Sequence, residues 1–116
     1  MSLDFAADKR ILATELFDGR LDRYGIHQGC SSDGIRYLAD RIGVLWVFLH
    51  DDKFVDFFTV SISDGDPSKI LVAIQDAFKT KIFSEREPQY WGFDTVEEWE
   101  NSTEWFNPKA VHEIII

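Results

Sequence analysis

The chain has 116 residues, of which 45% are hydrophobic and 15% aromatic, and it carries a formal net charge of −9 with a sequence pI of about 4.6. This length fits one domain with its own core, and the apolar content excludes a chain that is disordered throughout. The acidic balance argues against direct binding to nucleic acids or to anionic membrane surfaces.

The single cysteine excludes an internal disulfide framework. The starting stretch MSLDFAADKRIL carries charges where a signal peptide needs an apolar core, and no apolar run reaches the length of a membrane span. We therefore expect a cytoplasmic protein. The one glycosylation sequon, at Asn101, is interpreted as accidental.

Residues 3–17 are predicted to form an amphipathic helix. Phe5, Leu12 and Leu16 recur with approximately helical spacing. Gly19 offers a stop just beyond the last periodic residue.

The stretch SSDGIRYLADRIG, residues 31–43, predicts a second helix. Ser31 or Ser32 suits the N-cap, and Asp33 suits the first turn, where the helix dipole favours an acid. Gly43 suits the position just past the end. The predicted apolar stripe consists of Ile35, Leu38, Ala39 and Ile42.

Residues 44–50 and 54–63 predict an antiparallel β-hairpin. The first segment, VLWVFLH, is continuously apolar and is typical of a central strand covered on both faces. In the second, FVDFFTVSIS, alternation points Phe58, Val60 and Ile62 to one face.

Residues 67–80 predict a third helix, with Asp66 as its cap and Pro67 in its first position. Its apolar residues are Ile70, Leu71, Ile74, Ala77 and Phe78. The segment from Glu85 to Glu104 then holds seven acids and one base and predicts a short acidic helix. The final AVHEIII is apolar enough to be a strand added to the sheet. Together these elements predict a single α+β domain over residues 1–116.

The stretch SSDGIRYLADRIGVLWVFL resembles a family of short bacterial proteins, often carried on mobile elements, that is known only as a domain of unknown function. The upstream stretch LFDGRLDRYGIH resembles the family's Phe-x-Gly followed by Tyr and His. The resemblance covers about residues 12–62 and implies a small α+β domain in which a helix leads into a hairpin; it implies no activity. The matching positions are Ser32, Asp33, Gly34, Arg36, Tyr37, Ala39, Asp40, Gly43 and Trp46.

Cys30 is a candidate nucleophile, with His27 or His50 as its base and Asp33 as an orienting acid. A thiol near a helix N-terminus is favoured as the reactive thiolate. However, the partners in most Cys–His enzymes come from distant segments, whereas His27 and Cys30 are three positions apart. We favour the simpler interpretation that Cys30 is a small apolar residue and its neighbours are capping residues. A small Cys30 enzyme is the alternative.

A metal site is not predicted. His27, Cys30 and His50, with His112 in reserve, supply enough zinc ligands but lack the paired spacing of such sites. No cofactor is expected either. His50 is followed by two aspartates, so it is also a candidate general base at the end of a strand.

The acidic tail predicts a protein-binding surface. Tryptophan and tyrosine are typical interface anchors, and carboxylates around them select a basic partner or imitate nucleic-acid phosphates. We therefore expect a non-catalytic module, of an inhibitor or immunity type, that acts on a basic or nucleic-acid-binding protein. Two alternatives stay open: the rings fill the core, or they form a homodimer interface. The predicted partner-binding residues are Trp91, Glu97, Glu98, Trp99, Glu100, Glu104 and Trp105.

Overall fold

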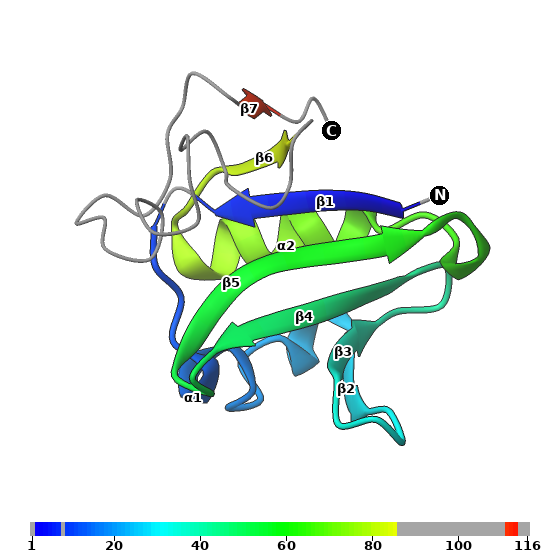
Figure 1. Cartoon of the computed structure of the whole chain (residues 1–116), viewed down its shortest axis with the longest axis horizontal. Coiled ribbons are helices and arrows are strands. Elements are labelled where there is room, and N and C mark those ends of the chain that lie inside the picture. The colour runs from blue at the N-terminus through cyan, green and yellow to red at the C-terminus, as the bar shows by residue number, and fades with distance from the viewer. Residues whose placement is uncertain (1, 8, 86–110, 114–116) are drawn as a thin grey trace.

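The computed structural model describes residues 2–7, 9–85 and 111–113 (Figure 1). Two α-helices, two short 3-10 helices (η) and seven strands are described in these residues. In chain order the elements are β1 (Ser2–Ala7), α1 (Ala13–Leu16), η1 (Asp22–Tyr24), β2 (His27–Cys30), β3 (Arg36–Ala39), β4 (Val44–His50), β5 (Phe54–Ser61), η2 (Ile62–Asp64), α2 (Ser68–Phe78), β6 (Ile82–Glu85) and β7 (Val111–Glu113).

The strands form one sheet in the order β2-β3-β4-β5-β1-β6-β7, and each neighbouring pair is antiparallel. β1 lies between β5 and β6, which both come much later in the chain. The helix α2 packs on one face of this sheet (Figure 1). The chain therefore forms an α+β domain, with more strands and fewer helices than the sequence predicts.

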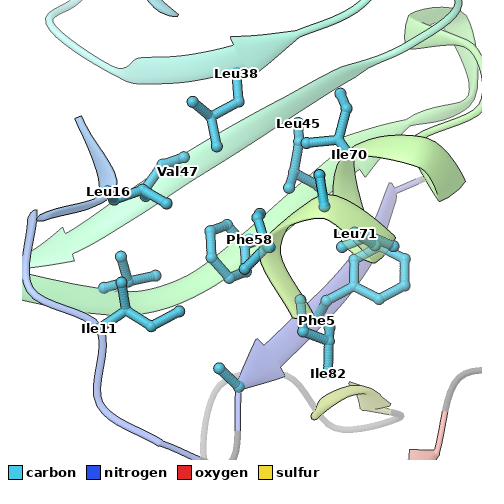
Figure 2. Close-up of a cluster of buried hydrophobic side chains, with 14 of the residues drawn as sticks. Phe5, Ile11, Leu16, Leu38, Leu45, Val47, Phe58, Ile70, Leu71 and Ile82 are labelled. Carbon is cyan, nitrogen blue, oxygen red and sulfur yellow. The ribbon is translucent and has the colours of Figure 1, made fainter. Parts of the chain in front are cut away.

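The core lies between α2 and the sheet, and Phe58 stands near the centre of its side chains (Figure 2). Alternate residues of the central strands point into it, as the sequence predicts for Phe58 and Val60. Burying one such large side chain stabilises the fold by about 1.5–3 kcal/mol. The largest fully buried side chains are Phe58, Leu16, Leu21, Leu38, Leu45, Ile70, Ile74, Ile82 and Val47.

The helix α2 lies within the range predicted for a third helix, although it is only the second α-helix of the described chain. Its apolar residues share one face, where Ile70 and Ile74 are fully buried. The predicted cap is wrong, because Pro67 is the N-cap residue, although the carboxylate of Asp66 accepts a hydrogen bond from the Ser68 N–H at 2.9 Å. The helix ends at Lys79, which adopts a left-handed conformation with φ 53°.

The predicted helix over residues 3–17 is wrong. Its first part is β1, and only Ala13–Leu16 is helical. β1 forms ladders with β5 on one side and β6 on the other, and its last three residues, Phe5, Ala6 and Ala7, are all buried. Backbone pairing on both edges, supplied by distant segments, outweighs a local helical pattern.

The predicted helix over residues 31–43 is also wrong. This stretch holds the β2–β3 turn, where Gly34 has φ +85°, and then β3. Of the predicted apolar stripe only Leu38 is fully buried, whereas Ile42 lies in the next turn and is 50% exposed. Gly43 does not end a helix but pairs with Gly65 in an isolated bridge.

The predicted hairpin is confirmed, because β4 and β5 pair from Trp46 opposite Thr59 to His50 opposite Phe54. β7 lies within the predicted final strand and pairs with β6. The predicted acidic helix lies outside the described residues. No helix in the described part of the chain has both the length and the apolar character that crossing a membrane requires.

Candidate functional site

The sheet carries a row of aromatic side chains on the face opposite the core. Side chains of β4 and β5 alternate, so those between the buried residues point away from α2. The helical residues that pack on the sheet, such as Leu16 and Ile70, all belong to the core cluster on the other face. We call this row the aromatic face, and it comprises Tyr37, Trp46, Phe48, His50, Phe54 and Phe57.

The rings of the aromatic face pack in three pairs. Tyr37 and Trp46 meet edge to face with centroids 5.3 Å apart. Phe48 and Phe57 are stacked at 4.6 Å, and His50 is stacked on Phe54 at 5.0 Å. All six rings remain partly exposed. Pairs of this kind contribute about 0.5–1.5 kcal/mol beyond burial, so the face is held in a fixed arrangement.

A β-bulge places Asp56 on the aromatic face. Phe48 pairs with Phe57 and Leu49 with Val55, which leaves Asp56 as the extra residue of β5. The side chain of Asp56 is 13% exposed, and its Oδ1 atom lies 3.6 Å from Nδ1 of His50. That oxygen accepts no hydrogen bond within the described part of the chain.

Burial determines the protonation of Asp56 beside His50. Burial raises the pKa of the Asp56 carboxyl to about 6, against the lowering effect of His50 and with a further raising effect from Asp51. The other ring nitrogen of His50, Nε2, lies 3.5 Å from the carboxylate of Asp51. Asp56 therefore changes its protonation state close to neutral pH, which is unusual for an aspartate.

The turn beyond His50 is made by two consecutive non-glycine residues in the left-handed region. Asp51 has φ 53° and Asp52 has φ 56°, and the Lys53 N–H donates to the His50 carbonyl at 3.0 Å. This is a β-turn with positive φ at both central residues, within a three-residue loop, and aspartate is tolerated there better than most side chains. The turn holds a pair of exposed carboxylates at the end of the aromatic face.

A further acid, Asp64, is tied to the aromatic face through Trp46. The indole Nε1–H of Trp46 donates to Oδ2 of Asp64 at 2.7 Å. Desolvation acts to raise the pKa of Asp64, but hydrogen bonds from Ser61 and Trp46 hold it below the usual value. Asp64 is therefore a fixed negative charge that orients the indole ring.

The predicted cysteine site is not assembled. Cys30 and His27 both lie on the edge strand β2, but residues three positions apart in a strand point to opposite faces. His50 is two strands away, on β4, which alone separates it from Cys30 by about 10 Å. Asp33 lies at the exposed tip of the β2–β3 turn.

The residues expected to cap a helix form this turn instead. The Ile35 N–H donates to the Ser31 hydroxyl at 3.1 Å, and the Gly34 N–H donates to the Ser31 carbonyl at 3.0 Å. Cys30 is exposed, and its thiol lies 3.6 Å from the Ser31 carbonyl oxygen. The stretch is therefore a hairpin tip rather than the start of a helix.

Metal ligands do not gather in the described ranges, where no three His, Cys, Asp or Glu side chains are close enough to hold an ion. The predicted partner-binding residues lie outside the described part of the chain, so that prediction stays open. These residues are Trp91, Glu97, Glu98, Trp99, Glu100, Glu104 and Trp105.

Sequence reasoning missed Asp56 and the aromatic face. The sequence predicts that β4 is covered on both faces, whereas the helices of the described residues pack on only one face of the sheet. The signal for the bulge lies in β5 itself, because Val55 and Phe58 are both buried although they are three positions apart. Strict alternation would place them on opposite faces, so one extra residue between them is required.

Comparison of the chain with models of protein families, with curated proteins and with solved structures found no match.

Proposed function

We propose that this protein is a non-catalytic acidic binding module that docks a basic protein on its aromatic face. The observation that carries this proposal is the row of paired, partly exposed rings on the side of the sheet away from α2. Aromatic residues that are held rigid lose little entropy on binding, and they are enriched among the anchors of protein interfaces.

The charge around the face supports a basic partner. Asp51 and Asp52 stand at one end of it, Asp64 is bonded to Trp46, and Asp4 pairs with Thr59 on the same side of the sheet. The chain as a whole carries −9. Acids beside exposed rings attract lysine and arginine side chains and speed association at low salt.

An arginine of the chain itself lies on this face. The guanidinium carbon of Arg10 lies over the ring of Phe54, 4.3 Å from its centroid. Such a cation–π contact contributes about 0.5–2 kcal/mol, depending on exposure. Phe48, whose ring stacks on that of Phe57, is also partly exposed on this face. An inhibitor or immunity-type role against a nucleic-acid-binding protein is the finer form of this proposal.

The alternative of a small enzyme built on Cys30 receives less support. It needs His27 or His50 within hydrogen-bond reach of the thiol. The strand alternation of β2 and the position of β4 hold both histidines away from it.

Removal of either central ring is expected to weaken binding. We expect Phe48→Ala and Phe57→Ala each to weaken capture of a basic partner at least about 10-fold, because interface anchors contribute about 2 kcal/mol or more. The measurement is affinity purification from the native host, followed by titration of the purified partner with each variant. Raising the salt concentration is expected to slow association, as it does for complementary charges.

The matched control is Phe78→Ala. Phe78 is also a partly buried phenylalanine, but it packs against the core from α2 on the other side of the sheet. This variant should bind like the unchanged protein. If all three variants retain the same partner equally, or if the partner is acidic, the aromatic face is not the docking surface.

A further inference from the structure

Two neighbouring hollows lie between α2 and the β3–β4 turn, away from the aromatic face. One has a volume of about 460 Å³ and the other about 370 Å³, and they share Tyr24 and Lys69. We call the two together the Lys69 groove. Besides the two shared residues, the first is lined by Ser68, Val72, Ala73 and Asp76, and the second by Gly25, Asp40, Arg41 and Ile42.

The fold fixes the walls of this groove. The β3–β4 turn is brought against the start of α2 by the bridge between Gly43 and Gly65. The opposite wall is Tyr24, whose hydroxyl donates to the Asp76 carboxylate and accepts from the Arg23 guanidinium at 2.9 Å. The groove is therefore formed before any ligand arrives, as small-molecule sites usually are.

The groove has an apolar part. Val72 is 44% exposed and Ile42 is 50% exposed, and both are among the large apolar side chains that the described residues leave in water. Ala73, on the same helix as Val72, contributes to the lining. Covering this surface with the apolar body of a ligand removes it from water, at roughly 25 cal/mol for each Å².

The groove also has two basic groups. Lys69 and Arg41 are exposed and form no ion pair with a carboxylate of the described residues. The lining also holds two acids, Asp76 and Asp40, and the buried Oδ2 atom of Asp40 accepts no hydrogen bond within the described residues. Asp76 accepts from Tyr24, and Oδ1 of Asp40 accepts from the backbone N–H groups of Ile42 and Gly43, each at 2.8 Å. Lys69 and Arg41 are therefore the groups of the lining that can attract an anion.

We propose that the Lys69 groove binds a small carboxylate with an apolar body. The apolar body lies against Val72 and Ala73, and the carboxylate lies between Lys69 and Arg41. A guanidinium pairs with a carboxylate through two parallel hydrogen bonds, so Arg41 selects this group over a neutral one. The volume of the larger hollow falls in the usual range for ligand sites, about 300–1,000 Å³. The proposal does not depend on the function of the aromatic face.

The test is a titration of the ¹⁵N-labelled full chain with 4-phenylbutyrate, followed by the amide signals. We expect a saturable response at Tyr24, Ile42 and Lys69 to Ala73, with a Kd on the order of 1 mM for a ligand of this size. The matched probe 4-phenylbutylamine, which carries the opposite charge on the same apolar body, is expected to bind at least about 10-fold more weakly. Equal affinity for the two probes, or a response elsewhere, overturns the proposal.

Variants at Lys69 and Arg41 distinguish specific binding of the carboxylate from nonspecific hydrophobic binding of the phenyl group. Lys69→Gln and Arg41→Gln are each expected to raise the Kd for 4-phenylbutyrate about 5-fold, the value of one exposed charge pair. Lys53→Gln, an exposed lysine in the β4–β5 turn, is the control and should leave the Kd unchanged. Because all three side chains are exposed, the variants are expected to keep the spectrum of the folded protein. An unchanged Kd in both groove variants rules out the site.

Discussion

Replacing Gly65 with alanine is expected to lower the free energy of unfolding by about 4 kcal/mol. Gly65 has φ 87° and ψ −154°, a region that residues with a side chain essentially never occupy. An added Cβ would also stand 1.9 Å from the carbonyl oxygen of Ile42, so the backbone must move apart. Urea unfolding of both proteins measures the difference.

Gly34→Ala is the matched control for this prediction. Gly34 has a similar φ of +85°, but nothing lies within 4 Å of an added Cβ. Only the conformational cost then applies, and we expect a loss of about 1 kcal/mol. The excess at Gly65 reports its more restricted φ/ψ region together with the close approach of the β3–β4 turn to the chain that leads into α2. Equal losses at the two glycines would show that this approach adds nothing to stability.

Asp56→Asn is expected to raise the free energy of unfolding at neutral pH by up to about 3 kcal/mol. Burial raises the pKa of Asp56 from 3.8 to about 6 in the folded protein. The folded state then holds this proton more tightly than the unfolded chain. Protonated Asp56 therefore contributes its whole stabilising effect to the free energy of unfolding below about pH 4. This effect is lost as the pH rises to about 6. Asparagine does not ionise and avoids this loss.

The measurement is urea unfolding of both proteins from about pH 3 to about pH 8. The free energy of unfolding of Asp56→Asn should exceed that of the unchanged protein by an amount that grows between about pH 4 and 6 and stays constant above that range. Hydrogen bonds lower the pKa of Asp18 and Asp66, so these groups destabilise both proteins equally as the pH falls and cancel in the difference. Asp33→Asn, at an exposed carboxylate in the β2–β3 turn, should show no such gain. An advantage that shrinks with rising pH would contradict burial as the cause.

The parts of the fold that could be predicted from the sequence are those with local causes. The hairpin of β4 and β5 follows from two apolar runs separated by a short polar turn. The helix α2 follows from one apolar stripe and from Asp66, whose carboxylate binds the first turn. In each case the residues that determine the element lie within it or next to it.

The parts that could not be predicted depend on partners far along the chain. Thr59 donates to the Leu3 carbonyl across 56 positions, and nothing near Leu3 signals such a neighbour. The spacing of Ile35, Leu38 and Ile42 suits a helix equally well, until pairing with β2 and β4 makes the segment a strand. The candidate site depends on the register between two strands, which placed Asp56 in a bulge.

The place of β1 between β5 and β6 has a consequence for how the protein folds. Ser2 must find Ser61, and Ala7 must find Ile82, before the middle of the sheet is complete. Closing such long loops costs conformational entropy before the contacts between the strands contribute any stabilising free energy. Proteins rich in such distant pairings therefore fold slowly. Until β1 inserts, β5 and β6 each present an unpaired edge that can recruit a strand from another molecule. Slow pairing of residues 2–7 with β5 and β6 is therefore expected to prolong the exposure of these edges.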